Sequence, residues 1–396
     1  MPQATPGTGV AVALTVLMNA GPWLPVPPPG YGGIENVVAT LSRELRRRGV
    51  RVVFAGALDS RIEDDGRVGR FEAGRFRDLA APYPQVMGVA HAHMQAVVAE
   101  LDARDDIDLV HDHLEVVGAA VLAALGPDGP PALQTLHWDL RKHPEFYGSF
   151  DGRGRVAFNA LSRRQLAQAP SRLRRQVLGI IPLAVPLDEL AFQPEKGDRV
   201  LALGRITPVK GVDVAARVCR SVGIGLDVAG PVAGLRDAGE LEGELARPGS
   251  GFRDRADVRH WLEDVRQHVD GERVRWIGSV DGEAKTRLVG RARALVCPVR
   301  WEEPGATAAV EALACGTPVI AARRGAFADI VEDGVTGFLV DDERALAAAL
   351  HRVDEIDPAA CRAAAETRFS PAVMADTYLG LYERILSRRP RTRESP

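Results

Sequence analysis

The sequence predicts an α/β protein made of two Rossmann-like domains that face each other across a cleft. Two successions of short apolar strands alternate with helical stretches, a pattern typical of parallel sheets covered by helices on both faces. The 396 residues are 46% apolar, which suits two hydrophobic cores rather than one. A stretch rich in proline and charged residues, about 186–197, separates the two successions and predicts the domain boundary.

Each half is expected to contain six strands. In the first half they cover 10–18, 51–57, 109–113, 132–137, 156–161 and 179–185, and in the second half 199–204, 226–230, 274–278, 294–299, 318–322 and 337–340. The first helix is expected over 35–48, and Ser370-Pro371 predicts the start of the last helix. The predicted division is a first domain over 1–190, a second over 191–370, a final helix over 371–388 and a disordered tail over 389–396.

The charge of the chain argues against one class of partner. The formal net charge of −3 argues against a nucleic-acid partner, since binding to a phosphate backbone needs a concentrated basic face. The densest basic cluster ends the first helix, where cations are favoured by the helix dipole: Arg43, Arg46, Arg47 and Arg48. A solvated helix end is the preferred interpretation, and a membrane-binding surface is the alternative.

The sequence also indicates a compartment. No apolar run is long enough to span a membrane, and the apolar residues 10–18 follow no basic segment. We therefore expect a cytoplasmic protein without an integral membrane segment, and its oligomeric state stays open. The four cysteines lack metal-ligand spacing and are expected to be reduced core thiols: Cys219, Cys297, Cys315 and Cys361.

The most informative segment runs from Trp301 to Ile320. Its alanine-rich part, 306–314, predicts a helix that begins after Pro304-Gly305. The free amides and the dipole of a helix N-terminus favour a phosphate, which small side chains allow to approach closely. Glu303 lies before this helix, in reach of hydroxyls beside the phosphate, and Glu311 lies two turns in, where it can accept from a ribose. The segment predicts a site for a sugar joined to a nucleotide by a diphosphate.

Two other groups follow predicted strands, where doubly wound sheets bind their ligands. Arg205 and Lys210 lie on one loop and can neutralise a diphosphate, although a solvated loop pair is the simpler alternative. Lys210 is one of only four lysines in an arginine-rich chain, which favours a specific role: Lys142, Lys196, Lys210 and Lys285. A glycine-rich loop, 30–33, can present backbone amides to a ligand or simply form a tight turn.

Histidines raise a further alternative. His137 ends the fourth expected strand and is either a structural histidine or part of the site. His91 and His93, and likewise His111 and His113, alternate along the sequence and would share one face of an extended segment. Such pairs are compatible with zinc. The preferred interpretation is that Asp112, His113 and Glu115 line a pocket for a second substrate, the acceptor of the sugar.

The segment from Glu303 to Glu311, EPGATAAVE, resembles the E-x7-E signature of the retaining, GT-B-fold glycosyltransferases of family 4. The loop over 29–35, Thr135-Leu136-His137 and the loop over 204–211 resemble further pieces of that family, and the resemblance covers nearly the whole chain. It implies a GT-B fold in which the first domain binds the acceptor, the second binds the nucleotide sugar, and the last helix crosses back to the first domain.

The resemblance also implies an activity. A sugar would pass from a nucleotide diphosphate sugar, most often a UDP-sugar, to a hydroxyl acceptor with retention at the anomeric carbon, without a metal or another cofactor. A small soluble acceptor or secondary metabolite is favoured over a lipid or polysaccharide. The alternatives are a GT-B hydrolase or epimerase of the same nucleotide sugar, and a nucleotide-sugar-binding protein without turnover.

The resemblance further assigns roles to individual residues. It implies catalytic roles for Glu303, His137, Arg205 and Lys210. It implies donor contacts for Gly32, Gly33, Arg205, Lys210, Gly278, Val280, Glu303, Ala306, Thr307, Ala308 and Glu311, with Glu303 on the sugar and Glu311 on the ribose. It implies acceptor contacts for Tyr31, Glu35, His113, Glu115 and Asp139.

The sequence departs from the family's pattern in two places. The usual Glu-Pro-Phe-Gly is replaced by Glu303-Pro304-Gly305-Ala306, which removes an aromatic ring beside the phosphate. The common Asn-Gly at the end of the first domain is replaced by Leu183-Ala184. Sugar preference and the details of the hinge or acceptor site are therefore expected to differ from those of typical members.

Overall fold

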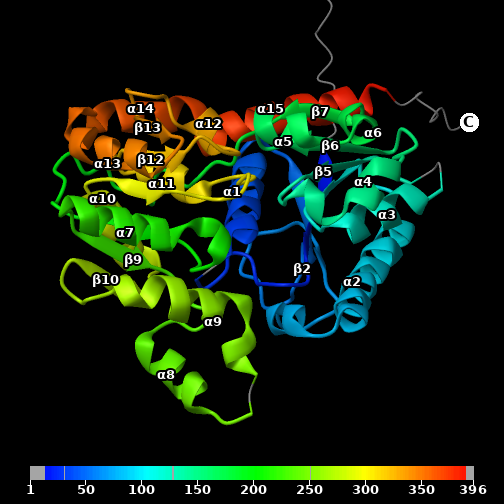
Figure 1. Ribbon diagram of the computed structural model, residues 1–396. Coiled ribbons are helices and arrows are strands. Elements are labelled where there is room, and N and C mark those ends of the chain that lie inside the picture. Colours follow the sequence, from blue (N-terminus) through cyan, green and yellow to red (C-terminus); the bar gives the residue numbers. More distant parts are fainter. Residues whose placement is uncertain (1–13, 31, 127–128, 250, 389–396) are drawn as a thin grey trace, which may run out of the picture.

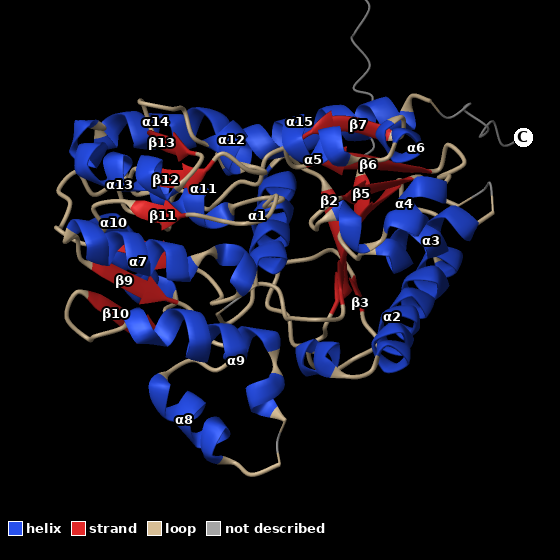
Figure 2. Ribbon diagram, in the orientation of Figure 1, coloured by secondary structure: helices blue, strands red, loops and turns tan. Residues whose placement is uncertain are grey.

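The computed structural model describes residues 14–30, 32–126, 129–249 and 251–388. Figure 1 shows two lobes side by side, and Figure 2 shows that each lobe holds a sheet with helices packed around it. The first sheet has seven strands in the order β3-β2-β1-β4-β5-β6-β7, and the second has six in the order β10-β9-β8-β11-β12-β13. Neighbouring strands run parallel in both sheets, as the near-continuous apolar strands predicted.

The strands of the first sheet are β1 (Thr15–Gly21), β2 (Arg51–Gly56), β3 (Arg67–Val68), β4 (Leu109–Asp112), β5 (Ala132–Thr135), β6 (Val156–Ala160) and β7 (Val177–Ile180). Those of the second are β8 (Val200–Leu203), β9 (Leu226–Ala229), β10 (Val274–Gly278), β11 (Leu295–Cys297), β12 (Val319–Ala322) and β13 (Gly337–Val340).

The α-helices of the first lobe are α1 (Gly33–Arg47), α2 (Tyr83–Ala103), α3 (Val116–Ala124), α4 (Pro144–Ser149), α5 (Arg163–Gln168) and α6 (Ser171–Arg174). Those that follow are α7 (Val212–Val222), α8 (Ala238–Ala246), α9 (Ala256–His260), α10 (Gly282–Arg291), α11 (Thr307–Ala314), α12 (Phe327–Ile330), α13 (Glu343–Arg352), α14 (Pro358–Arg368) and α15 (Pro371–Leu386).

The strand order fixes where a ligand site can form. In the first sheet β1 lies between β2 and β4, and in the second sheet β8 lies between β9 and β11. The connections that follow β1 and β4 therefore run toward opposite edges of the first sheet, and those that follow β8 and β11 do so in the second. A crevice opens at such a switch point, outside the carboxyl ends of the strands. The glycine-rich loop follows β1, Lys210 follows β8, and Glu303 follows β11. The fold therefore gathers these segments at the edges where sites form.

The last helix crosses back to the first lobe, as the resemblance implied (Figure 1). Met374, Tyr378 and Tyr382 of α15 are buried in the same hydrophobic cluster as Met18 of β1 and Leu109 of β4. An ion pair of 2.7 Å joins Arg48, directly after α1, to Asp376 of α15. This packing ties the end of the chain to the first sheet.

The structure corrects several expected elements. The sixth strand of the first sheet was expected over 179–185, but β7 ends at Ile180, and the apolar residues after it are buried outside the sheet. The short β3 was not predicted. His91 and His93 lie on α2 rather than on a strand, so they do not share one face. The part of the first expected strand before residue 14 and the tail over 389–396 lie outside the described residues.

The structure also bears on the expectations for the cysteines, the arginine cluster and membrane-spanning segments. All four cysteines are buried and unpaired with one another. Each arginine of the cluster at the end of α1 forms an ion pair with a carboxylate: Arg43, Arg46, Arg47 and Arg48. Within the part of the chain that the structure describes, no helix combines the length and the apolar character needed to cross a membrane.

Candidate active site

The start of α11 is the centre of the candidate site. Ala306 caps this helix in the left-handed region, with φ 48° and ψ 46°, which is unusual for a residue with a side chain. The first amides of a helix lack partners within it, so those near Ala306, Thr307 and Ala308 are suited to an anion. A Cβ on Gly33 would lie 3.9 Å from the Thr307 hydroxyl oxygen. The glycine-rich loop of the first lobe therefore meets the helix start of the second.

Glu303 and Lys210 form an ion pair beside this helix. The Lys210 Nζ lies 2.5 Å from Glu303 Oε2, and the Trp301 indole nitrogen donates to the same oxygen at 2.9 Å. The ammonium also lies 5.6 Å from the centre of the Trp301 ring, within range of a cation–π interaction. The structure thus brings together two residues that the sequence placed 93 positions apart. Trp301 was missed as a partner of the pair.

The backbone around this pair is tightly held. Gly211 follows Lys210 at φ 70°, and a Cβ there would lie 2.1 Å from the Pro298 carbonyl oxygen. Arg300 donates to the Pro208 carbonyl oxygen at 3.0 Å and pairs with the buried Asp213, which fixes the turn that carries Lys210. These contacts arise from packing between β8 and β11, and no pattern in the sequence indicated them.

Glu303 is supported from a second loop. The amide of Ala326 donates to the Glu303 carbonyl oxygen at 2.7 Å, and the amide of Gly325 donates to the side chain of Glu302 at 2.5 Å. Gly325 has φ 52°, and a Cβ on it would lie 2.2 Å from the Glu303 carbonyl oxygen. Only glycine permits this approach.

Glu311 is also paired with a lysine. Lys285 of α10 lies 2.7 Å from Glu311 Oε1, and both side chains are about three-quarters or more buried. Lys285 had been noted only as one of the four lysines. Gly278 ends β10 with φ 76°, and the amide of Ser279 donates to the Arg236 carbonyl oxygen at 2.7 Å. Val280 packs at the edge of the second core, next to α10.

Arg205 and Lys210 differ in their exposure. Its side chain is exposed, whereas Lys210 is half-buried. Burial raises the pKa of Asp257 in α9, and the charge of Arg205 lowers it, so Arg205 faces α9 as well as the loop. The two cations expected to act together are therefore on one loop but have different surroundings.

His137, in the first lobe, forms a hydrogen bond with a buried histidine. His113 Nδ1 lies 2.7 Å from His137 Nε2. Loss of contact with water lowers the pKa of His137 to about 3, and it also holds the pKa of His113 well below its usual value. His137 is half-buried, but His113 is buried behind it. His113 was expected to contact the acceptor, yet its place is behind His137. Both rings are neutral, which suits a site for hydroxyls rather than anions.

The other residues expected to contact an acceptor differ in their burial and in their partners. Glu115 lies 3.2 Å from His143 Nε2, and Asp139 forms an ion pair of 2.7 Å with Arg141. Glu35 is buried at the start of α1, and this burial raises its pKa to about 7. Tyr31 lies outside the described residues. Asp112, which was grouped with them, is fully buried and hydrogen-bonded to Asn19 at 2.6 Å.

The carboxyl ends of the two sheets face each other through direct contacts. A Cβ on Gly305 would lie 2.4 Å from Leu183 and 3.3 Å from Leu161, both of the first lobe. Arg163 at the start of α5 donates its amide to Asp329 of α12 at 2.6 Å. The segment that carries Glu303 therefore packs on the loops that follow β6 and β7.

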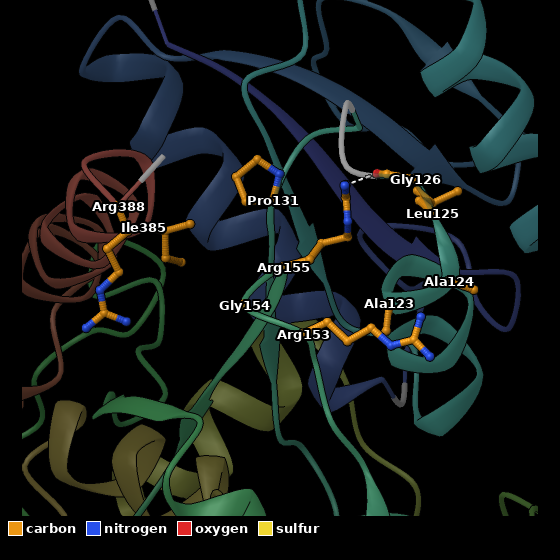
Figure 3. Close-up of a pocket in the computed structure, with 10 residues that line it drawn as sticks. All are labelled: Ala123, Ala124, Leu125, Gly126, Pro131, Arg153, Gly154, Arg155, Ile385 and Arg388. Carbon is orange, nitrogen blue, oxygen red and sulfur yellow. Dashed lines mark hydrogen bonds between the residues drawn. The ribbon is translucent and has the colours of Figure 1, made fainter. Parts of the chain in front are cut away.

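A cavity of about 460 Å³ lies elsewhere (Figure 3). It is bounded by residues before β5 and β6 and by the end of α15, including Pro131, Arg155 and Ile385. These residues precede their strands, so the cavity lies at the amino ends of the sheet, away from His137. The Arg155 side chain beside it donates to the Gly126 carbonyl oxygen, which gives this arginine a structural role.

Comparison with known proteins decides the family. Residues 31–172 match the family described as Glycosyltransferase Family 4, and residues 189–368 match Glycosyl transferases group 1. A D-inositol 3-phosphate glycosyltransferase of Mycolicibacterium smegmatis is 30% identical over 365 residues, which cover 85% of this chain and 77% of that protein. The chain belongs to glycosyltransferase family 4.

A second sequence relative and a solved structure agree with this family and its fold. A phosphatidyl-myo-inositol mannosyltransferase of Mycobacterium leprae is 28% identical, over 89% of this chain and 93% of that protein. A sucrose-phosphate synthase of Thermosynechococcus elongatus superposes with a TM-score of 0.69 at 20% identity, over 95% of this chain and 100% of that chain. The two facing Rossmann-like domains are those of the GT-B fold.

The described residues of this glycosyltransferase contain no cluster of metal-ligating side chains that supports the zinc alternative. Among the described residues, no group of three or more histidine, cysteine, aspartate or glutamate side chains is arranged to hold a metal ion. His111 and His113 do share a face, with ring centres 4.2 Å apart, but their nitrogens bond to protein groups.

Proposed function

We propose that this glycosyltransferase moves a sugar from a nucleotide diphosphate sugar to a hydroxyl acceptor with retention of anomeric configuration and without a metal. The observation that carries the proposal is the position of the Lys210–Glu303 pair beside the start of α11, opposite the glycine-rich loop. A cation, a set of free amides and a carboxylate then surround one point. These are the groups that a diphosphate and its sugar hydroxyls require.

The proposed roles follow from this arrangement. Lys210, Arg205 and the amides at Ala306–Ala308 hold the diphosphate. Glu303 accepts hydrogen bonds from sugar hydroxyls, and Glu311 accepts from the ribose. The base lies near Gly278 and Val280, and UDP is the first nucleotide to test.

The proposed reaction takes place on one face of the sugar. The bond between the anomeric carbon and the diphosphate oxygen breaks, and a bond from that carbon to the acceptor oxygen forms on the same side. The acceptor's proton passes to the leaving diphosphate. Negative charge grows on the diphosphate as the bond breaks, so fixed positive groups favour the transition state over the ground state.

The acceptor is proposed from the relatives. One is named for D-inositol 3-phosphate and another for phosphatidyl-myo-inositol, so a phosphorylated cyclitol is common to both names. The two names differ in whether this polar group is linked to a lipid, so both forms are tested as acceptors.

The experiment begins with the donor. A panel of UDP-, GDP- and ADP-sugars is screened by thermal shift, because a ligand at 100 times its Kd stabilises the fold by about 2.7 kcal/mol. The best donor is then incubated with inositol phosphate, with lipid vesicles carrying phosphatidylinositol, and with water alone. NMR of the product gives its anomeric configuration. Inversion would overturn retention, and release of free sugar without any acceptor product would favour the hydrolase alternative.

Metal independence is tested in the same assay. Transfer is expected to survive EDTA, because Lys210 and the helix N-terminus supply the positive charge that a divalent ion supplies elsewhere. Loss of activity in EDTA that Mn²⁺ or Mg²⁺ restores would contradict this part of the proposal.

A further inference from the structure

The hydrogen bonds of His113 specify which of its nitrogens carries the proton. His113 Nε2 lies 3.2 Å from the sulfur of Met18, and its Nδ1 lies 2.7 Å from His137 Nε2. A thioether sulfur has no proton and can only accept. The proton of His113 must therefore be on Nε2 for this contact to be a hydrogen bond, and its Nδ1 is left as an acceptor.

This arrangement determines the state of His137 in turn. Both rings are neutral, because removal from water lowers the pKa of each well below neutrality. A neutral imidazole has one donor nitrogen and one acceptor nitrogen. If His113 Nδ1 accepts, His137 must donate from Nε2, and its Nδ1 keeps a free lone pair. No residue within the described ranges forms a hydrogen bond with that nitrogen.

A second network of hydrogen bonds occupies both nitrogens of the neighbouring His111, so that His111 does not compete for a hydrogen bond with His113. The Thr135 hydroxyl donates to Asn159 Oδ1 at 2.8 Å, so the Thr135 oxygen accepts from His111 Nε2, also at 2.8 Å. His111 Nδ1 then accepts from the Tyr382 hydroxyl of α15 at 2.7 Å. Both nitrogens of His111 are satisfied, and its ring packs against His113 without a hydrogen bond to it.

We propose that His113 and Met18 are positioning residues that hold His137 as the tautomer protonated on Nε2, so that its Nδ1 presents a lone pair at the carboxyl end of β5. This inference rests on the proposed function for what the lone pair meets. A hydroxyl of the donor sugar or of the acceptor would donate to Nδ1, and an anionic group would be disfavoured there. His137 then orients a hydroxyl without adding positive charge near the anomeric carbon.

The first test reads the tautomer directly and does not depend on activity. The full chain, with ¹⁵N-labelled histidine rings, is examined by NMR at neutral pH without ligand, and a His137→Gln variant assigns the His137 signals among the nine histidines. A protonated Nε2 and an unprotonated Nδ1 are expected. A proton on Nδ1, an equal mixture or a charged ring would overturn the proposal, whether or not the protein transfers sugars.

The second test removes the sulfur. Met18→Leu keeps the size of a buried side chain but leaves His113 Nε2 without its acceptor, and it is expected to shift the tautomer ratio of His137 by about fivefold, the value of one modest hydrogen bond. Turnover should fall with little change in donor KM.

The control is Met94→Leu. Met94 is equally buried, and its sulfur accepts from Asn19 Nδ2 at 3.3 Å, in a network that does not include His137. It should leave the His137 signals unchanged. An unchanged tautomer ratio in a folded Met18→Leu variant would show that the sulfur does not set the proton, and would overturn the proposal.

Discussion

Glu303 and Glu311 each pair with a lysine from a different element. Lys210 comes from the loop after β8 and holds Glu303, and Lys285 comes from α10 and holds Glu311. An ammonium is a compact charge on a flexible stem, whereas a guanidinium is a rigid fork. In a chain where arginine is the usual cation, lysines at these two places give ion pairs that are less rigid than arginine–carboxylate pairs.

Removing Lys210 should therefore affect turnover more than binding. In Lys210→Ala, the leaving diphosphate loses a cation whose value grows toward the transition state, and Glu303 loses the partner that orients it. A loss of turnover on the order of 100-fold is expected, as for deletion of one electrostatic donor. Steady-state kinetics with varied donor give the answer. Unchanged turnover with only a raised donor KM would contradict the role in the leaving group.

The two glutamates should separate by the part of the donor that each contacts. Glu303→Ala is expected to leave binding of the free nucleoside diphosphate nearly intact and to abolish discrimination between sugars. Glu311→Ala is expected to weaken the nucleotide and the nucleotide sugar alike, by about 1.5–3 kcal/mol for a hydrogen bond to a charged group. Calorimetry of both variants with both ligands measures this.

Lys285→Met supplies the control for Glu311. It removes the partner of Glu311 but keeps its carboxylate, so it should weaken nucleotide binding less than Glu311→Ala does. Equal loss of the bare nucleotide in Glu303→Ala and Glu311→Ala would mean that the proposed orientation of the donor is mistaken.

The sequence patterns pointed to Glu303, Lys210 and Glu311, but not to the residues that support them. Lys210 follows β8 and Glu303 follows β11, so the sheet topology brings them to one edge, and Glu311 lies on α11, the helix that follows Glu303. Trp301, Lys285 and Gly325 act through contacts between distant segments, and no local pattern encodes such contacts. Likewise, the spacing between His113 and His137 in the sequence does not show that His113 is the more buried of the two.

At the scale of elements, the loop before α12 fixes the backbone of Glu303. Gly325 approaches so closely that a Cβ would lie 2.2 Å from the Glu303 carbonyl oxygen and 2.3 Å from its nitrogen. Backbone atoms cannot move aside as the end of a side chain can. The position of Glu303 thus depends on a glycine 22 residues further along the chain, which follows β12.

Gly325→Ala should therefore lower turnover beyond its effect on stability. Gly334→Ala is the matched control, because Gly334 also has a positive φ, of 79°, but its Cβ would meet no atom within 4 Å. Both variants should lose about 1–2 kcal/mol from left-handed backbone strain. Only Gly325→Ala should lose turnover on the order of 100-fold, since small misplacement of a reacting group is costly. Thermal unfolding and kinetics of both variants decide it, and equal turnover in the two would refute the clash.

The elements themselves were well predicted because each buried strand leaves a local apolar pattern. The twelve expected strands appear, and the first and last helices end close to their predicted residues. β3 has only two residues, too short for any pattern. β7 was predicted too far along the chain, since Ile181, Leu183 and Val185 are apolar because they are buried in hydrophobic clusters and not because they form a strand.

At the scale of the whole molecule, the two departures from the family's pattern meet each other. Gly305 replaces an aromatic residue, and Leu183 replaces a polar one, and the structure places Leu183 in the space beside Gly305. The side chain that one lobe lacks is thus replaced by a side chain from the other. This contact joins the segment that carries Glu303 to the loop after β7, and it therefore lies between the two lobes.

The pair predicts a coupling that can be measured. Gly305 does not have a positive φ, so alanine is allowed by the backbone, but its Cβ would lie 2.4 Å from Leu183. Gly305→Ala should lower both stability and turnover by pushing the lobes apart, and Leu183→Ala should relieve this clash. The two changes should therefore be non-additive by about 0.5–3 kcal/mol, the range for residues in contact.

Leu122→Ala provides the comparison, because Leu122 is equally apolar and buried but belongs to a separate core cluster. Its combination with Gly305→Ala should be additive within about 0.5 kcal/mol. Recovery of turnover in Gly305→Ala/Leu183→Ala, together with loss in Gly305→Ala/Leu122→Ala, would show that the contact acts on lobe closure rather than on general stability. Additive free energies in both pairs, without recovery of turnover, would mean that the lobes close independently of this contact.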